Sequence, residues 1–295
     1  MTDVTIRPMR ADDVPVVERL SAEGFHELDV RTYQRDWPEP SLRSPERARA
    51  WETRTRHFLD TDPGGCWVAE ADDGIVGFAI SVNRELMWIL ASYAVRPGLQ
   101  GQGIGLQLLA AALHHGRGCL RGMLAASSDP KAVRRYRLAG FTLHPQMLLW
   151  GRVPRAAIPV VEQVRDGSLA DVDLMDSIDR QTRGAAHGSD HELLFREFRL
   201  LVADRTTGSG YVYVNDVGSP VLLAATNRRT ATDLAWAALA GSDPGVQVDI
   251  AHVTADNEWM IDVGVAARME VHQRGYLALR RMKPPRPYLH HGSFL

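Results

Sequence analysis

Cysteine is scarce in this sequence, and neither sign of charge is in excess. Two cysteines, Cys66 and Cys119, occur among 295 residues, in unrelated contexts and without the spacing of metal ligands. A disulfide framework or a cysteine-based zinc site is therefore not expected. Lys and Arg number 34 against 36 Asp and Glu, which gives a formal net charge of −2. Since nucleic-acid-binding proteins usually carry a basic excess, we expect no nucleic-acid partner.

Long apolar runs are also missing. The longest, from Leu86 to Val95, is interrupted by Ser92 and is too short to cross a bilayer. The first five residues show no basic segment followed by an apolar one, so no signal peptide is predicted. We therefore expect no membrane partner and a cytoplasmic protein.

The composition that remains, 45% hydrophobic and 24% charged, is that of a soluble globular protein, and the length suits two domains. In the first half, alternation and short apolar runs predict strands at 4–9, 66–70, 75–82, 86–95 and 120–126, and a closing strand pair over 141–153. Helical periodicity predicts helices at 11–24, 106–115 and 130–139, and Ser44-Pro45-Glu46 begins another. Residues 26–44 have no clear period and are predicted to form an irregular loop.

The segment 151–155 is the best linker candidate, and after it the order of elements begins again. In the second half the predicted strands are 160–164, 210–214, 221–225, 246–253 and 275–279. The predicted helices are 169–180, 191–199, 232–239 and 258–269. The order echoes the first half although the residues do not, which indicates an imperfect internal duplication.

A glycine-rich turn joins the apolar strand at 86–95 to the helix at 106–115. It contains Gln100, Gly101, Gly103 and Gly105. Glycine permits positive φ and a close approach of the backbone to a ligand, and the free N–H groups of a first helical turn favour a phosphate. The turn lacks the Gly-Lys-Ser/Thr of a Walker A motif, and its glycine spacing is not that of a dinucleotide motif. It therefore predicts an anion cradle of another kind.

The pattern Gln-x-x-Gly-x-Gly, formed by Gln100, Gly103 and Gly105, resembles motif A of the GNAT (GCN5-related N-acetyltransferase) superfamily. Downstream, the segment 132–141, which contains Tyr136 and ends in Ala-Gly-Phe, resembles motif B. With the repeated order of elements in the second half, these motifs make the chain resemble a tandem GNAT protein with a degenerate C-terminal copy. The resemblance implies an α/β (α+β) fold of two GNAT-like domains, each a twisted mixed β-sheet flanked by helices.

The implied domains are an acetyl-CoA-binding GNAT domain at 1–153 and a degenerate GNAT-like domain, with a docked C-terminal tail, at 154–295. Residues 226–232 stand where motif A of the second domain should be, and they contain no glycine. The backbone there cannot close on a pyrophosphate as the first turn can. Arg228 and Arg229 could still attract a phosphate by charge.

Acetyl-CoA is the implied cosubstrate, bound in a V between the strands at 86–95 and 120–126. Backbone groups around Ala94 and Val95 would pair with the pantetheine and polarise the thioester carbonyl. The implied cofactor-binding residues are Ala94, Val95, Gln100, Gly101, Gln102, Gly103, Ile104 and Gly105. No metal is expected, because Gly188 stands between His187 and His191 and no Glu follows His187.

Tyr136 is the candidate general acid. It matches the motif B tyrosine that many GNAT enzymes place near the CoA sulfur, where it would protonate the departing thiolate. Packing against the sheet edge is the alternative role.

The general base is less defined. The position at which some family members carry a Glu is Ile89, and the expected same-face neighbours Ala91 and Tyr93 offer no carboxylate. Glu85 has the right parity but stands roughly 13 Å away along the strand. Three routes stay open: a water chain through Tyr93 or Ser92, a group from the mobile 26–44 segment (His26, Glu27 or Asp29), or an amine that arrives deprotonated.

The function implied is direct acetyl transfer from acetyl-CoA to a primary amine of a small molecule. Acetylation of a protein lysine or N-terminus is an alternative, and so is a non-catalytic acetyl-CoA-binding sensor, which the missing carboxylate base favours. A homodimer is also open. The tail at 284–295 is too aromatic for a disordered end and is expected to dock, either on the domain interface or in the acceptor cleft.

Overall fold

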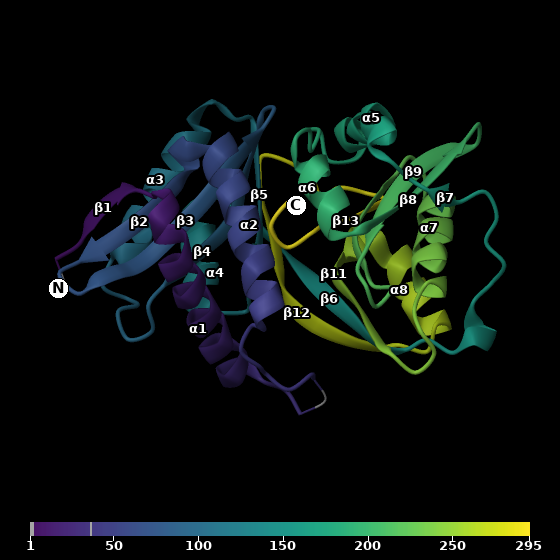
Figure 1. Cartoon of the computed structure of the whole chain (residues 1–295), viewed down its shortest axis with the longest axis horizontal. Coiled ribbons are helices and arrows are strands. Elements are labelled where there is room, and N and C mark those ends of the chain that lie inside the picture. Colours follow the sequence, from purple (N-terminus) through teal and green to yellow (C-terminus); the bar gives the residue numbers. More distant parts are fainter. Residues whose placement is uncertain (1–2, 36) are drawn as a thin grey trace. The chain divides into compact units, whose positions relative to one another are not determined.

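The computed structural model describes residues 3–35 and 37–295, and the chain divides into two compact units. The first unit is Met1–Leu120 with Ser128–Ala139, and the second is Arg121–Ser127 with Gly140–Leu295 (Figure 1). This division differs from the one expected at residue 153, because the strand that follows Gly140 lies in the second unit. The expected boundary concerns family domains rather than compactness, and it stays a prediction.

The first unit contains helices and an antiparallel sheet whose strands pair in the order β1-β2-β3-β4. Its strands are β1 Thr5–Pro8, β2 Cys66–Ala71, β3 Gly74–Arg84 and β4 Met87–Val95. Its helices are α1 Val14–Thr32, α2 Pro45–Thr61, α3 Ile104–His115 and α4 Pro130–Leu138, and short 3-10 turns occupy Ala11–Asp13, Pro63–Gly65 and Gly116–Gly118. These elements confirm the strands and helices predicted for this part of the chain.

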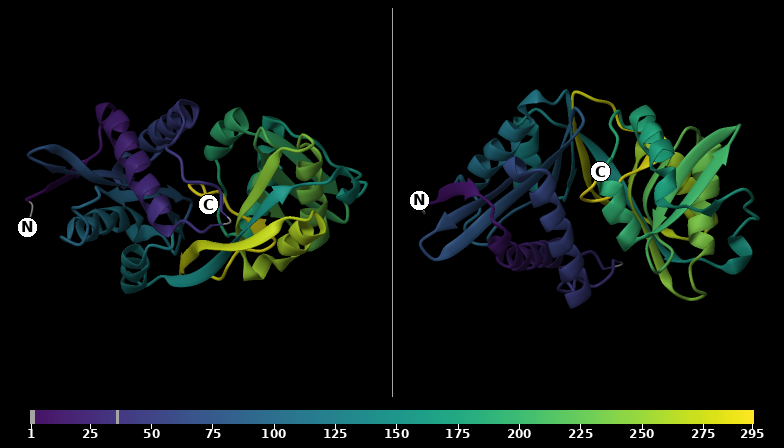
Figure 2. Two further views of the ribbon diagram at one scale, coloured as in Figure 1. Left: turned by 90° about the horizontal axis from the view of Figure 1, so that it is seen from below. Right: turned by 45° about the horizontal axis from the view of Figure 1, so that its top comes forward.

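Helices cover both faces of the first unit's sheet (Figure 2). On one face, the ring of Phe78 on β3 packs edge-on against Trp51 on α2, with centroids 5.9 Å apart. On the other face, Leu108 on α3 lies so close to Gly77 that an added Cβ would come within 2.9 Å of its Cδ1. The alternation of β3 thus fixes α1 and α2 on one side and α3 on the other.

The predicted irregular loop at 26–44 is wrong in its first part. Helix α1 continues to Thr32, so His26, Glu27 and Asp29 are helical rather than on a mobile segment. No proline or glycine interrupts residues 25–32. Near its end, Arg31 forms an ion pair of 2.5 Å with Asp129 at the start of α4. Asp36 lies outside the described residues.

The second unit contains two antiparallel sheets, with strand orders β5-β12-β6-β11 and β13-β10-β9-β8-β7. Its strands are β5 Arg121–Ala126, β6 Thr142–Arg152, β7 Arg165–Asp166, β8 Arg199–Arg205, β9 Gly208–Val214, β10 Pro220–Ala225, β11 Gln247–Thr254, β12 Glu270–Arg280 and β13 Tyr288–Leu289. Its helices are α5 Val172–Thr182, α6 Asp190–Glu197, α7 Arg228–Ala240 and α8 Glu258–Ala266. None of the helices within the described residues is long and apolar enough to span a membrane.

The main core of the second unit lies between α7, α8 and the two sheets. Alternate residues of β8, β9 and β10, among them Leu201, Val212 and Leu223, pack with Leu234 of α7. The residues between them, such as Tyr211 and Tyr213, point to the opposite face, which α5 and α6 cover. The α/β (α+β) class that the sequence predicts, with sheets flanked by helices, is confirmed.

Two predicted elements within the second unit differ in the structure. The expected strand pair at 141–153 is the single strand β6, which pairs with β12 on one side and β11 on the other. The expected strand at 160–164 is irregular, with Val160 90% exposed. The C-terminal tail is ordered against this unit: Leu289 pairs with β10, and Phe294 and Leu295 are fully buried.

Candidate active site

The glycine-rich loop after β4 is fixed at its start by Arg96. Its backbone N–H donates to the carbonyl oxygen of Val76 at 2.7 Å, and its guanidinium donates to Asp73 at 2.5 Å and to the Ile75 carbonyl at 3.0 Å. Further along, Nε2 of Gln100 donates back to the carbonyl oxygen of Val95 at 3.3 Å. The motif glutamine therefore closes the loop on the end of β4.

Two glycines of the loop have the positive φ that glycine permits. Gly101 has φ +90° and Gly103 has φ +91°, a region that other residues rarely adopt. A Cβ at either position would meet no atom within 4 Å, so the space beside the loop is open. Gly103 is the N-cap of α3 and has no side chain with which to cap it, whereas Ile104 is buried and anchors the first turn. The N–H groups of that turn are therefore placed for an anionic ligand.

Gly105 serves a different purpose. An added Cβ would come within 2.2 Å of the Tyr93 hydroxyl, which donates to the carbonyl oxygen of Gly105 at 2.7 Å. This hydrogen bond joins β4 to the first turn of α3. Burial raises the pKa of Tyr93 to about 12, so its hydroxyl stays protonated near neutral pH.

Tyr136 lies beside Tyr93. Helix α4, which carries it, begins at Pro130, and the carboxylate of Asp129 accepts from the N–H groups of Lys131 at 2.7 Å and Ala132 at 3.4 Å. The rings of Tyr93 and Tyr136 are 6.4 Å apart, edge to face. Tyr136 is buried, and burial raises its pKa, so it remains a protonated donor. The structure thus brings the candidate acid to the loop, and its catalytic role stays a prediction.

A β-bulge in β4 changes which residues of the strand share a face. Ser92 pairs with Ile80 of β3, but Leu90 pairs with the next residue, Ser81, so Ala91 is the extra residue. Residues directly opposite each other share a face. Tyr93 therefore shares its face with Leu90, and the expected grouping of Ile89, Ala91 and Tyr93 on one face is wrong.

The two residues of the proposed water route are neighbours in β4, and ordinary strand alternation puts them on opposite faces. Ser92 points to the face opposite that of Tyr93, so each would contribute alone. Glu85 is not on the strand: it lies in the β3–β4 turn with φ +52°. Ala94 and Val95 pair with Phe78 and Gly77 of β3. The roles of these residues and of Gln102 in binding or catalysis stay predictions.

The corresponding strand–helix junction of the second unit is capped by its own side chain. Asn227 is the N-cap of α7, and its Oδ1 accepts from the Thr230 N–H at 2.9 Å. Its amide also donates to the carbonyl oxygen of Thr207 at 2.9 Å. Arg228 and Arg229 are exposed. One N–H group that a phosphate would need is therefore already satisfied within the helix.

Comparison with known proteins finds a family model that matches part of the chain. Residues 23–141 match the model of the Acetyltransferase (GNAT) family. None of the curated proteins matches the chain.

Solved structures match over nearly the whole chain. A proposed acetyltransferase from Pyrococcus horikoshii is similar with a TM-score of 0.74 and 17% identity, covering 99% of this chain and 95% of that one. A GCN5-related N-acetyltransferase from Sphaerobacter thermophilus matches with a TM-score of 0.58 and 16% identity, covering 95% and 96%. A tandem GNAT protein from the clavulanic acid biosynthesis pathway matches with a TM-score of 0.58 and 15% identity, covering 94% and 98%. At these identities the likeness concerns the fold.

Proposed function

We propose that the chain, of which residues 23–141 match the model of the Acetyltransferase (GNAT) family, transfers the acetyl group of acetyl-CoA to a primary amine of a small molecule. One observation carries the proposal. The loop after β4 leads into α3, whose N-cap residue is Gly103, with φ +91° and free space beside it. No side chain caps this helix start, so its backbone N–H groups can bind a ligand. A pyrophosphate is the kind of group that such a start binds.

In this proposal the loop and the end of β4 bind different parts of acetyl-CoA. The Gln100–Gly105 loop holds the pyrophosphate, and backbone groups at Ala94 and Val95 face the pantetheine and the thioester carbonyl. Acetyl-CoA supplies the acyl group as a thioester. The loop and β4 therefore orient the acyl carbon toward the amine.

The transfer itself needs one proton at sulfur. The amine nitrogen forms a bond to the acyl carbon while the carbon–sulfur bond breaks. Tyr136 gives its hydroxyl proton to the departing sulfur, the nitrogen loses a proton to water, and Tyr136 regains one from water. The products are the amide and free CoA thiol.

A non-catalytic acetyl-CoA-binding sensor is the second candidate function, and the geometry of β4 supports it. The face of Tyr93 carries Leu90 after the bulge, and Glu85 lies in a turn, so neither position puts a carboxylate beside the acyl site. A sensor needs the loop but no base.

Release of free CoA thiol separates these functions. The chain is incubated with acetyl-CoA and either a panel of small primary amines or peptides that present a lysine or a free N-terminus. We expect thiol release that depends on a small amine. Release with peptides alone would instead favour a protein acetyltransferase. Binding of acetyl-CoA without amine-dependent release would favour the sensor.

A further inference from the structure

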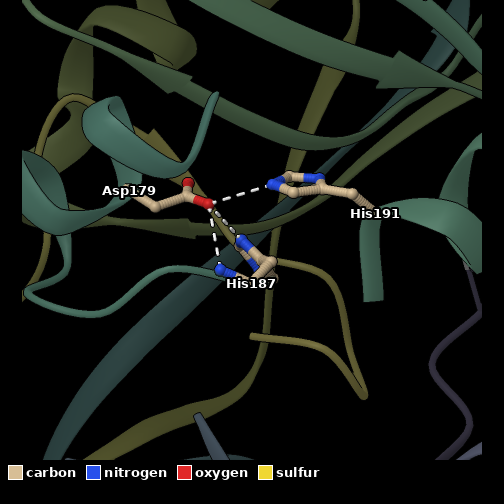
Figure 3. A group of neighbouring side chains, drawn as sticks. All are labelled: Asp179, His187 and His191. Atoms are coloured by element: carbon tan, nitrogen blue, oxygen red, sulfur yellow. Dashed lines mark hydrogen bonds and ion pairs between the residues drawn. The ribbon is translucent and has the colours of Figure 1, made fainter. Parts of the chain in front are cut away.

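Two carboxylates and two imidazoles meet inside the second unit, in what we call the Asp–His cluster: Asp176, Asp179, His187 and His191 (Figure 3 labels the last three). Asp176 and Asp179 stand three residues apart on α5 and so share a face of the helix. His187 precedes α6, and His191 is in its first turn. Asp179, His187 and His191 are all 0% exposed.

The donor atoms of Asp179, His187 and His191 lie within 4.8 Å of one another, and Asp176 adds a carboxylate oxygen beside His191. Oδ2 of Asp179 lies 2.6 Å from Nδ1 of His187 and 3.3 Å from Nε2 of His191. Oδ1 of Asp176 lies 3.3 Å from the same Nε2. Ligands at 2.0–2.1 Å from a tetrahedral Zn²⁺ are about 3.3 Å from one another. Two of these three separations already have that value. The third is the hydrogen bond between Nδ1 of His187 and Oδ2 of Asp179, which has to open by about 0.7 Å and lose its proton when an ion binds.

The ring of His191 is oriented for a cation. Its Nδ1 lies 3.1 Å from the Tyr213 hydroxyl, and that hydroxyl donates to the carbonyl oxygen of His191 at 3.4 Å. The hydroxyl oxygen is thus left to accept from Nδ1–H, so Nε2 is the ring atom that can hold either a proton or a metal ion. This Nε2 is buried and makes no hydrogen bond within residues 3–35 and 37–295, although two carboxylate oxygens face it. Two carboxylate oxygens beside this nitrogen call for a positive charge, which either a proton on the ring or a bound cation supplies.

Outer contacts hold the carboxylates in place. The Tyr211 hydroxyl donates to Oδ1 of Asp179 at 2.6 Å, which leaves Oδ2 for the cluster. The backbone N–H of Gly188 donates to Oδ1 of Asp176 at 3.0 Å. Gly188 has φ +58°, and this turn lets His187 lie ahead of α6 instead of on it. Such second contacts are typical of residues that orient metal ligands.

We propose that the Asp–His cluster binds one divalent transition-metal ion, with Zn²⁺ as the best-suited species, through Asp176 Oδ1, Asp179 Oδ2, His187 Nδ1 and His191 Nε2. Two carboxylates neutralise the ion and two neutral imidazoles bring the set to four protein ligands, the number that is usual in a closed site. The ion would tie α5 to α6. Gly188 and the absence of a Glu after His187 speak against a metal site on a single helix, and this cluster is of another kind because His187 lies before α6. This site is independent of the proposed acetyl transfer.

The test measures metal directly on the full chain. The protein is stripped with a chelator, titrated with Zn²⁺ by calorimetry, and loaded with Co²⁺ for a visible spectrum. We expect one equivalent of Zn²⁺ per chain, the d–d bands of tetrahedral Co²⁺, and a lower melting temperature for the stripped protein. Stripped wild-type protein that binds no Zn²⁺ and shows no tetrahedral Co²⁺ spectrum would overturn the proposal.

Variants locate the ion. Asp176→Asn keeps the shape of a partly exposed side chain and should weaken Zn²⁺ binding roughly 100-fold or more, since the loss of outer contacts alone costs 10–100-fold. His187→Ala with His191→Ala should abolish binding. His290→Asn, at a buried histidine of the same unit outside the cluster, should retain one equivalent. Zn²⁺ binding that survives both cluster variants would show that the ion sits elsewhere. If the double variant does not fold, Asp176→Asn and the Co²⁺ spectrum decide.

Discussion

Replacement of Tyr136 with Phe is expected to lower kcat roughly 10²–10⁴-fold and to leave the affinity for CoA unchanged. Phe keeps the ring that packs 6.4 Å from the ring of Tyr93, and removes only the hydroxyl that is proposed to protonate sulfur. Because burial raises the pKa of Tyr136, its hydroxyl stays protonated near neutral pH. The pH profile of the wild-type kcat should therefore show no change from ionisation of this hydroxyl. Steady-state kinetics with the best amine of the panel, together with calorimetry of CoA, measures both quantities.

Tyr93→Phe is the matched control for this prediction. Its hydroxyl donates to the Gly105 carbonyl at 2.7 Å and so holds the start of α3 to β4. Its loss should weaken CoA binding more than it lowers kcat, which is the opposite pattern. A Tyr136→Phe enzyme with the wild-type kcat would assign the proton at sulfur to water.

Gly103→Val is expected to raise the dissociation constant of CoA roughly 100-fold or more. A β-branched residue does not adopt φ +91° without strain, so the helix start has to rearrange. Two charge-assisted hydrogen bonds to a phosphate, worth about 1.5–3 kcal/mol each, would be lost with it. Calorimetric titration of CoA into the folded variant measures the change.

Gly245→Val separates backbone strain from loss of the loop. Gly245 has φ +82°, and an added Cβ there would also meet no atom within 4 Å, but it belongs to the second unit and not to the glycine-rich loop. This variant should bind CoA like the wild type. Unchanged CoA affinity in Gly103→Val would remove the loop from the cofactor site.

The fold was most predictable where local signals agreed. The apolar run of β4, the glycines of the loop and the helix after them are each visible in the sequence, and Ser44 caps α2 as expected, accepting from the Arg47 N–H. Strand β8 was missed because Arg199–Arg205 directly follows α6 and the helical pattern was extended across the join. Helix α1 was cut short at Gly24, although a single glycine within a helical run is tolerated.

The site was predictable only as far as local chemistry reaches. The positive φ of Gly101 and Gly103 could be predicted from residue type. The bulge at Ala91 could not, because it depends on how β3 and β4 pair. The Asp–His cluster was missed for a related reason. Asp176 and Asp179 have the spacing of one helix face, and His187 and His191 are four apart, yet only the packing of α5 against the segment before α6 brings the two pairs together.

The central claim is that the acetyl-CoA site lies in the Gln100–Gly105 loop, and a calorimetric titration of the whole chain with CoA tests it most directly. We predict one equivalent of CoA per chain, absent from Gly103→Val and fully retained when Arg228 and Arg229 are both replaced with Ala. The capped start of α7 leaves those arginines without a pyrophosphate cradle. Two equivalents per chain, or one that survives Gly103→Val, would contradict the account and place an acetyl-CoA site in the second unit.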